Sequence, residues 1–198
     1  MLTHSPVSST TIEEIGRHCR TSPSAAFAYF YFEFQNKDVR SQTVLRSLIM
    51  QLSFRCPRTP DALEKLFSEN GEGRRSPTPE ELFSTLKPII GSFEQAYIVF
   101  DALDECQDRR DFLKVIEEMH SWGFGTLHLL ATSRQEPDIA DVLKPLVSHD
   151  VPMDQQLIDS DIRVHVSKTL DSDNAFKRYP EKDRKMVENA LTEGAHGM

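Results

Sequence analysis

Apolar residues follow two spacings along the chain, and the helical spacing is the more frequent. In Ser41–Phe54 the apolar side chains recur every three or four residues, which places them on one stripe of a helix. The sequence Thr78-Pro79-Glu80-Glu81 is a capping box with proline at the first helical position, so a helix is expected to start there. Further helices are predicted at Ser8–Cys19, after Thr59-Pro60, and at Asp111–Trp122, Asp138–Leu143, Leu157–Leu170 and Pro180–Leu191.

Short apolar runs between these helices indicate buried strands. They are Ala26–Phe34, Ala96–Phe100 and Thr126–Ala131, with His149–Met153 as a candidate fourth strand. Strands that alternate with helices imply crossover connections, which favour a parallel sheet with helices on both faces. The pattern therefore predicts an α/β chain, with a three-layer αβα core over residues 1–154 and the beginning of a helical subdomain over residues 155–198.

Composition and charge exclude several classes of partner. The chain has 23 Lys and Arg against 31 Asp and Glu, a net charge of -8, and no basic stripe. Such a chain is unsuited to neutralising nucleic-acid phosphates or to docking on an anionic membrane, so neither partner is expected. The sequence has no signal-peptide pattern, no apolar run of membrane-spanning length, and three cysteines without CxxC spacing. These features favour a cytoplasmic location.

Two predicted strands end in side chains that could act on a phosphate ligand. Asp101 follows Tyr97–Phe100, Asp104 and Glu105 come within the next turn, and the following strand ends at Thr132-Ser133-Arg134. The carboxyl ends of parallel strands share one edge of a sheet, where ligands bind. A carboxylate there can hold Mg²⁺, a following acid can activate water, and a guanidinium can bind a terminal phosphate. The alternative is that both strands simply lead into polar loops.

The glycine-rich loop that would complete a nucleoside triphosphate site is missing from the sequence. A G-x-x-x-x-G-K-[ST] loop supplies backbone amides that hold the phosphates, and it occurs nowhere in the 198 residues. The chain has eight glycines, and the nearest stretch, Gly71–Ser76, follows no apolar strand and lies next to prolines. Nucleotide affinity is therefore expected to be very weak.

Several segments carry a family resemblance, and together they cover nearly the whole chain. They are SSTTIEEI, AFAYFYFEF, SQTVLRSLIMQL, AYIVFDALDEC, LHLLATSRQEPDI, DIRVHV and EGAHGM. In combination they resemble the NACHT-type P-loop NTPase domain of fungal NLR-like (STAND) signalling proteins, of the nephrocystin-3-like N-terminal type. Such domains are often joined to ankyrin or other repeats. The resemblance implies a P-loop NTPase-like parallel sheet.

The resemblance also implies roles for individual residues. Asp101 would coordinate Mg²⁺ as the Walker B acid, Asp104 and Glu105 would position or activate water as the catalytic pair, and Arg134 would bind the terminal phosphate. The cofactors of a complete family member would be Mg²⁺ and ATP or GTP. None of them is expected to bind tightly to this chain.

The N-terminal residues depart from the family pattern. By offset, Ser5 stands at the Mg²⁺-binding hydroxyl of the Walker A loop, whereas His4 stands at the phosphate-binding lysine and residues 1–3 replace glycine-rich sequence. We therefore expect a chain truncated at the Walker A loop, with the first strand of the sheet and the phosphate loop absent. Absence of that strand would expose a strand edge and leave the fragment marginally stable.

These expectations favour a fragment of a signal-transduction NTPase module with impaired nucleotide binding and hydrolysis. In a full-length protein, nucleotide exchange would switch the assembly state, and the partners would be further copies or flanking repeat and effector domains. Two alternatives remain open. One is a non-enzymatic pseudo-NTPase scaffold or protein-interaction module. The other is an α/β enzyme of another class that uses Asp101, Asp104 and Glu105 on a metal-bound substrate.

Overall fold

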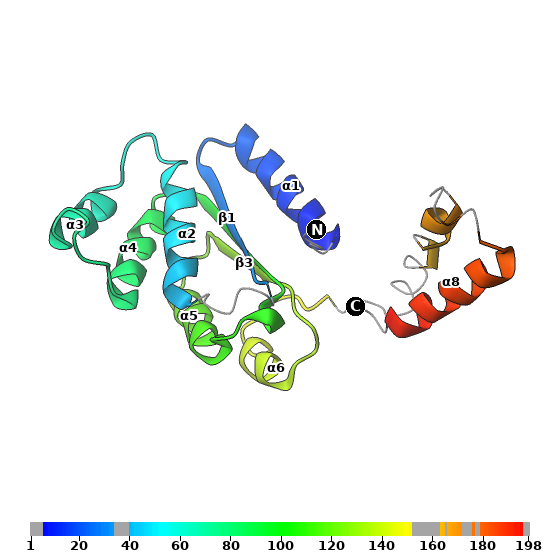
Figure 1. The fold of residues 1–198 in the computed structure, drawn as a ribbon. Coiled ribbons are helices and arrows are strands. Elements are labelled where there is room, and N and C mark those ends of the chain that lie inside the picture. Colours follow the sequence, from blue (N-terminus) through cyan, green and yellow to red (C-terminus); the bar gives the residue numbers. More distant parts are fainter. Residues whose placement is uncertain are drawn as a thin grey trace. The chain divides into compact units, whose positions relative to one another are not determined.

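A computed structural model describes residues 6–33, 40–151, 163–164, 166–171, 176 and 179–195 (Figure 1). Contacts between residues divide the chain into two units, Met1–Val147 and Ser148–Met198, and each is described by itself below. The domain boundary expected between residues 154 and 155 lies outside the described residues. No helix in the described part of the chain is long and apolar enough to cross a membrane.

The first unit is built on a parallel sheet of three strands in its described part. The strands are β1 (Ala25–Tyr31), β2 (Gln95–Asp101) and β3 (Leu127–Ala131), in the spatial order β1-β2-β3. In the register of the two pairs, Tyr31 lies opposite Asp101 and Phe100 lies opposite Ala131. The α/β class and the parallel direction predicted from the crossovers are confirmed. The first strand ends at Tyr31, whereas the sequence pattern predicted a longer strand, Ala26–Phe34.

Helices lie on both faces of the sheet. Helix α1 (Pro6–Thr21) covers one face, and α2 (Ser41–Ser53), α4 (Pro79–Gly91) and α5 (Arg109–Ser121) cover the other (Figure 1). Alternate residues of β2 point to opposite faces, so Ala96, Ile98 and Phe100 join the core cluster with α2, α4 and α5. Tyr97 and Asp101 face the other way, and the Tyr97 ring contacts His18 of α1. Asp101 therefore ends β2 on the α1 side.

Shorter elements complete the first unit. Helix α3 (Asp61–Glu69) packs on α4, and α6 (Pro137–Leu143) packs on α5. A single 3-10 turn, η1 (Leu103–Glu105), follows β2. The apolar stripe predicted for the helix at Ser41–Phe54 is buried in α2, where its members are Val44, Leu45, Leu48, Ile49 and Leu52. The helical period alone was therefore enough to identify the buried face of this helix.

The two edges of the sheet differ. Along β1, the Gln51 side chain accepts a hydrogen bond from the Tyr29 N–H (3.1 Å) and donates one to the Tyr29 carbonyl (2.9 Å). These bonds cover peptide groups that an edge strand otherwise exposes. Along β3, the Thr126 carbonyl and the Thr132 N–H form hydrogen bonds with the backbone of β2. Because the peptide groups of successive residues in a strand point in alternate directions, those of Leu129 and Ala131 point to the outer edge of the sheet. No strand of the described chain pairs with that edge.

The second unit contains helices and no strand in its described part. Residues 163–164 and 166–171 are helical, and α8 spans Glu181–Ala195, which agrees with the predicted helices as far as they are described. The candidate strand His149–Met153 is wrong in its described part, because residues 149–151 form no strand. Val151 is 79% exposed and follows the polar run Ser148-His149-Asp150, so this segment has no apolar face to bury. The remaining two residues lie outside the described part.

The predicted capping box at the start of α4 is confirmed. Thr78 Oγ1 accepts from the Glu81 N–H (3.3 Å), and the Glu81 carboxylate accepts from the Thr78 N–H (2.8 Å). Thr78→Ala removes the hydroxyl that satisfies one free helix N–H, so it is expected to lower the free energy of unfolding by about 0.5–2 kcal/mol. Thr59→Ala is the matched control, because α3 has no side-chain cap bond. Equal urea-denaturation midpoints for the two variants would contradict the expected stabilisation by the Thr78 cap.

Candidate functional site

Asp101 ends β2 at the carboxyl edge of the sheet. Its side chain is buried, with 4% of the residue exposed. Thr132, which follows β3, donates a hydrogen bond from Oγ1 to Asp101 Oδ1 (2.5 Å), and the same hydroxyl accepts from the Ala102 N–H (3.1 Å). The parallel β2–β3 register brings these groups together across 31 positions of sequence. The Thr132 hydroxyl therefore ties the Asp101 carboxylate to the backbone of the next residue.

The turn after Asp101 has a defined shape. Ala102 adopts the left-handed conformation (φ 56°, ψ 50°), which costs a non-glycine residue about 1–3 kcal/mol and is enriched at functional sites. Leu103 is fully buried beneath the turn, and its N–H donates to the Thr132 carbonyl (2.9 Å). With Leu103 fixed in the core, Asp104 and Glu105 are half-buried at the edge.

Asp104 and Arg134 contact each other directly. The Arg134 N–H donates to Asp104 Oδ1 (3.1 Å), and its Nε lies 3.4 Å from Asp104 Oδ2. The Asp104 side chain is 10% exposed, whereas that of Arg134 is 61% exposed. The edge of the sheet thus holds a carboxylate that is engaged by a cation on one side, while much of the guanidinium remains open to solvent.

A second arginine, which sequence reasoning did not select, supports this turn. Arg109 Nη1 donates to the Asp104 carbonyl (3.1 Å), and its Nε lies 2.7 Å from Asp138 of α6. Thr132 belonged to a segment that the sequence singled out, but its hydroxyl was given no role. Both residues follow strand ends or begin helices at the same edge, but their contacts depend on tertiary packing that no local pattern contains.

The structure brings together four of the five site residues selected from the sequence. Asp101, Asp104, Glu105 and Arg134 all lie at the carboxyl edge of β2 and β3. Ser5 lies outside the described residues. Among the described residues, no group of three or more His, Cys, Asp and Glu side chains could hold a metal ion. Mg²⁺ often uses only one or two protein carboxylates together with phosphate oxygens and water, so Asp101 fits it as a single ligand.

Cys106, which closes the turn, is not a nucleophile. It is 8% exposed, and burial raises the pKa of its thiol to about 11, although a hydrogen bond from the Asp108 backbone and the charge of Arg109 lower that pKa. The dominant cause of the raised pKa is burial in an apolar environment. The thiol is therefore protonated at neutral pH.

The first unit is therefore an α/β fold with a cluster of acidic and basic side chains at the carboxyl ends of two adjacent parallel strands. The chain matches the family described as nephrocystin 3, N-terminal, over residues 4–134, more than half of its length. It belongs to this family, as the sequence resemblance indicated. The matched range contains all three strands and every residue of the cluster. No curated protein matches the chain.

Proposed function

We propose that the chain is the core of a NACHT-type, STAND-class signalling NTPase of the fungal NLR-like kind, located in the cytoplasm. The observation that carries the proposal is the cluster at the carboxyl edge, where Asp101, Asp104 and Arg134 come from two adjacent strand ends. Ligands of open parallel sheets bind at this edge. The family membership over residues 4–134 supports the same assignment.

Each side chain of the cluster has a role in this proposal. Asp101, held by the Thr132 hydroxyl, offers one carboxylate to Mg²⁺, which when bound would neutralise phosphate charge. Asp104 and Glu105 position or deprotonate water, and the exposed Arg134 guanidinium binds the terminal phosphate of ATP or GTP. The Asp104–Arg134 contact holds the cation at the edge before any ligand is present.

The same proposal includes weak nucleotide binding by the 198-residue chain. Its sequence contains no G-x-x-x-x-G-K-[ST] loop, and His4 stands where a phosphate-binding lysine is expected by offset. The outer edge of β3 is open in the described chain and would accept one more parallel strand, the element from which a phosphate loop begins. Without the loop amides, the cluster alone supplies few contacts to phosphate.

A second candidate function, a pseudo-NTPase scaffold, is favoured by one observation. The Asp104 carboxylate already accepts from Arg134, and the Asp101 carboxylate accepts from Thr132, so both carboxylates have hydrogen-bond donors within the chain. A cluster of this kind can stabilise the fold without hydrolysing nucleotide. Protein contacts, with further copies or with flanking repeat and effector domains, would then be the retained function.

Titration with a fluorescent ATP analogue separates these functions. The unmodified chain is expected to bind it weakly and only with Mg²⁺. Asp101→Asn should abolish that binding, because the amide keeps an oxygen for Thr132 but loses the charge that attracts Mg²⁺. Asp61→Asn, an exposed position on α3, is the matched control and should bind like the unmodified chain.

Any other result of this titration would assign a different function to the chain. Tight binding that Asp101→Asn removes would show that the missing loop is not needed. Binding insensitive to Mg²⁺ and to Asp101→Asn would reject the nucleotide site and leave the scaffold. Metal-dependent turnover of a non-nucleotide substrate, lost in Asp101→Asn, would favour an α/β enzyme of another class.

A further inference from the structure

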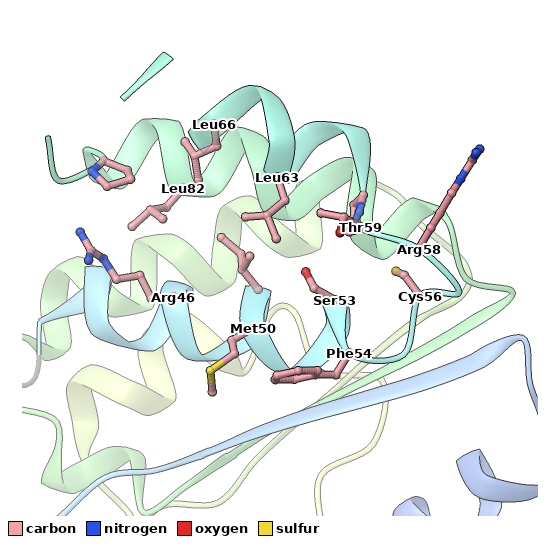
Figure 2. A pocket seen from close by; sticks show the side chains of 13 residues that line it. Arg46, Met50, Ser53, Phe54, Cys56, Arg58, Thr59, Leu63, Leu66 and Leu82 are labelled. Atoms are coloured by element: carbon pink, nitrogen blue, oxygen red, sulfur yellow. The ribbon is translucent and has the colours of Figure 1, made fainter. Parts of the chain in front are cut away.

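A groove of about 570 Å³ lies between α2, α3 and the start of α4 (Figure 2). Its wall is largely apolar and includes Ile49 and Met50 of α2, Leu63 and Leu66 of α3, and Leu82 of α4. None of the residues that line it belongs to the cluster around Asp101. The groove is therefore a second feature of the first unit, independent of the proposed nucleotide site.

Large apolar side chains at the groove are unusually exposed. Met50 is 54% exposed and Phe54, four residues further along, is 82% exposed. A pocket for a small molecule encloses most of its ligand, whereas an open apolar surface with methionine and aromatic side chains is typical of a protein interface. The exposure of these two residues favours a protein partner that covers them.

The charges that line the groove are all positive. Arg46 and Arg58 lie toward opposite ends of it in Figure 2, and no acidic residue lines it. In a chain of net charge -8, this local excess of cations is distinctive. Both arginines are exposed, so their guanidinium groups can reach carboxylates of an occupant.

We propose that this groove binds an amphipathic helix of a partner protein, with an apolar stripe and acidic residues near both ends. Arg46 to Ser53 spans about 10 Å of helix, which matches two turns of an occupant and anchors at positions i, i+3 or i+4, and i+7. The apolar anchors fill the space between Leu63, Leu66 and Leu82. The acidic residues pair with Arg46 and Arg58.

Selection from a display library of 16-residue peptides tests the proposal on the whole chain. Enriched peptides are expected to combine the apolar stripe with flanking Asp or Glu. Arg46→Glu/Arg58→Glu should bind them at least about tenfold more weakly, because two ion pairs become like-charge contacts. Arg20→Glu/Arg110→Glu, on α1 and α5, carries the same charge change outside the groove and should bind like the unmodified chain.

A charge swap makes the test specific. Lysine versions of the enriched peptides should regain binding to Arg46→Glu/Arg58→Glu and lose it on the unmodified chain. Enrichment of no peptide, of peptides without the stripe, or of peptides that bind both double variants equally would overturn the proposal. A concentration-dependent dimer that Arg46→Glu/Arg58→Glu dissociates would also overturn it, because the occupant would then be a second copy of this chain. Displacement of the peptides by dodecanoate would overturn it as well, because the occupant would then be a small amphiphile.

Discussion

Phe112→Ala is expected to lower the free energy of unfolding by about 3–5 kcal/mol, the range for a large aromatic removed from a packed core. Phe112 of α5 has no exposed surface, and its ring meets Phe32 and Phe100 edge-on at centroid distances of 5.1 and 5.0 Å. Alanine leaves a cavity that three elements would have to collapse to fill. A domain of ordinary stability has about 5–15 kcal/mol to lose, so the variant should unfold at much lower urea concentration.

Phe54→Ala is the matched control, because Phe54 is 82% exposed and its truncation should change stability little. The sequence also predicts that the chain is only marginally stable by itself. With marginal stability, Phe112→Ala should show no folded baseline in circular dichroism, whereas with ordinary stability it should show a transition at lower urea concentration. A loss of less than about 1 kcal/mol, together with a high-temperature cooperative melt of the unmodified chain, would contradict both the core assignment and the marginal stability.

The elements of this fold could be predicted where one local pattern decides them. The stripe of α2 and the capping box of α4 are complete within a few residues, so sequence alone identified both. Strand direction followed from the crossovers between strands. The candidate strand at His149–Met153 is wrong over residues 149–151, because the polar run Ser148-His149-Asp150 leaves Val151 without an apolar face to bury.

The chemistry of the site was only partly predictable. Strand ends identified Asp101, Asp104, Glu105 and Arg134, because polar residues after apolar strands share one edge of a parallel sheet. The sequence could not show that Arg134 engages Asp104, nor that the Thr132 hydroxyl engages Asp101, since both contacts depend on the β2–β3 register. The groove could not be predicted either, because packing of α3 against α4 creates it.

Thr132→Val is expected to lower the free energy of unfolding by about 1–3 kcal/mol, because it removes two hydrogen bonds from a buried site. Valine keeps the shape of threonine but removes the hydroxyl. The Asp101 carboxylate then loses the donor at 2.5 Å, and the Ala102 N–H loses its acceptor at 3.1 Å. Because Ala102 is held in the left-handed conformation, loss of that acceptor should also loosen the turn that carries Asp104 and Glu105.

Thr132→Ser separates the hydroxyl from the shape of the side chain. It keeps both hydrogen bonds and removes one methyl group, so its loss of stability should stay below about 0.8 kcal/mol. Urea denaturation measures the two changes, and hydrogen exchange at Leu103, whose N–H donates to the Thr132 carbonyl, should rise in the valine variant alone. Equal stability losses in the two variants would show that side-chain shape, and not the Asp101–Thr132 hydrogen bond, holds this edge of the sheet together.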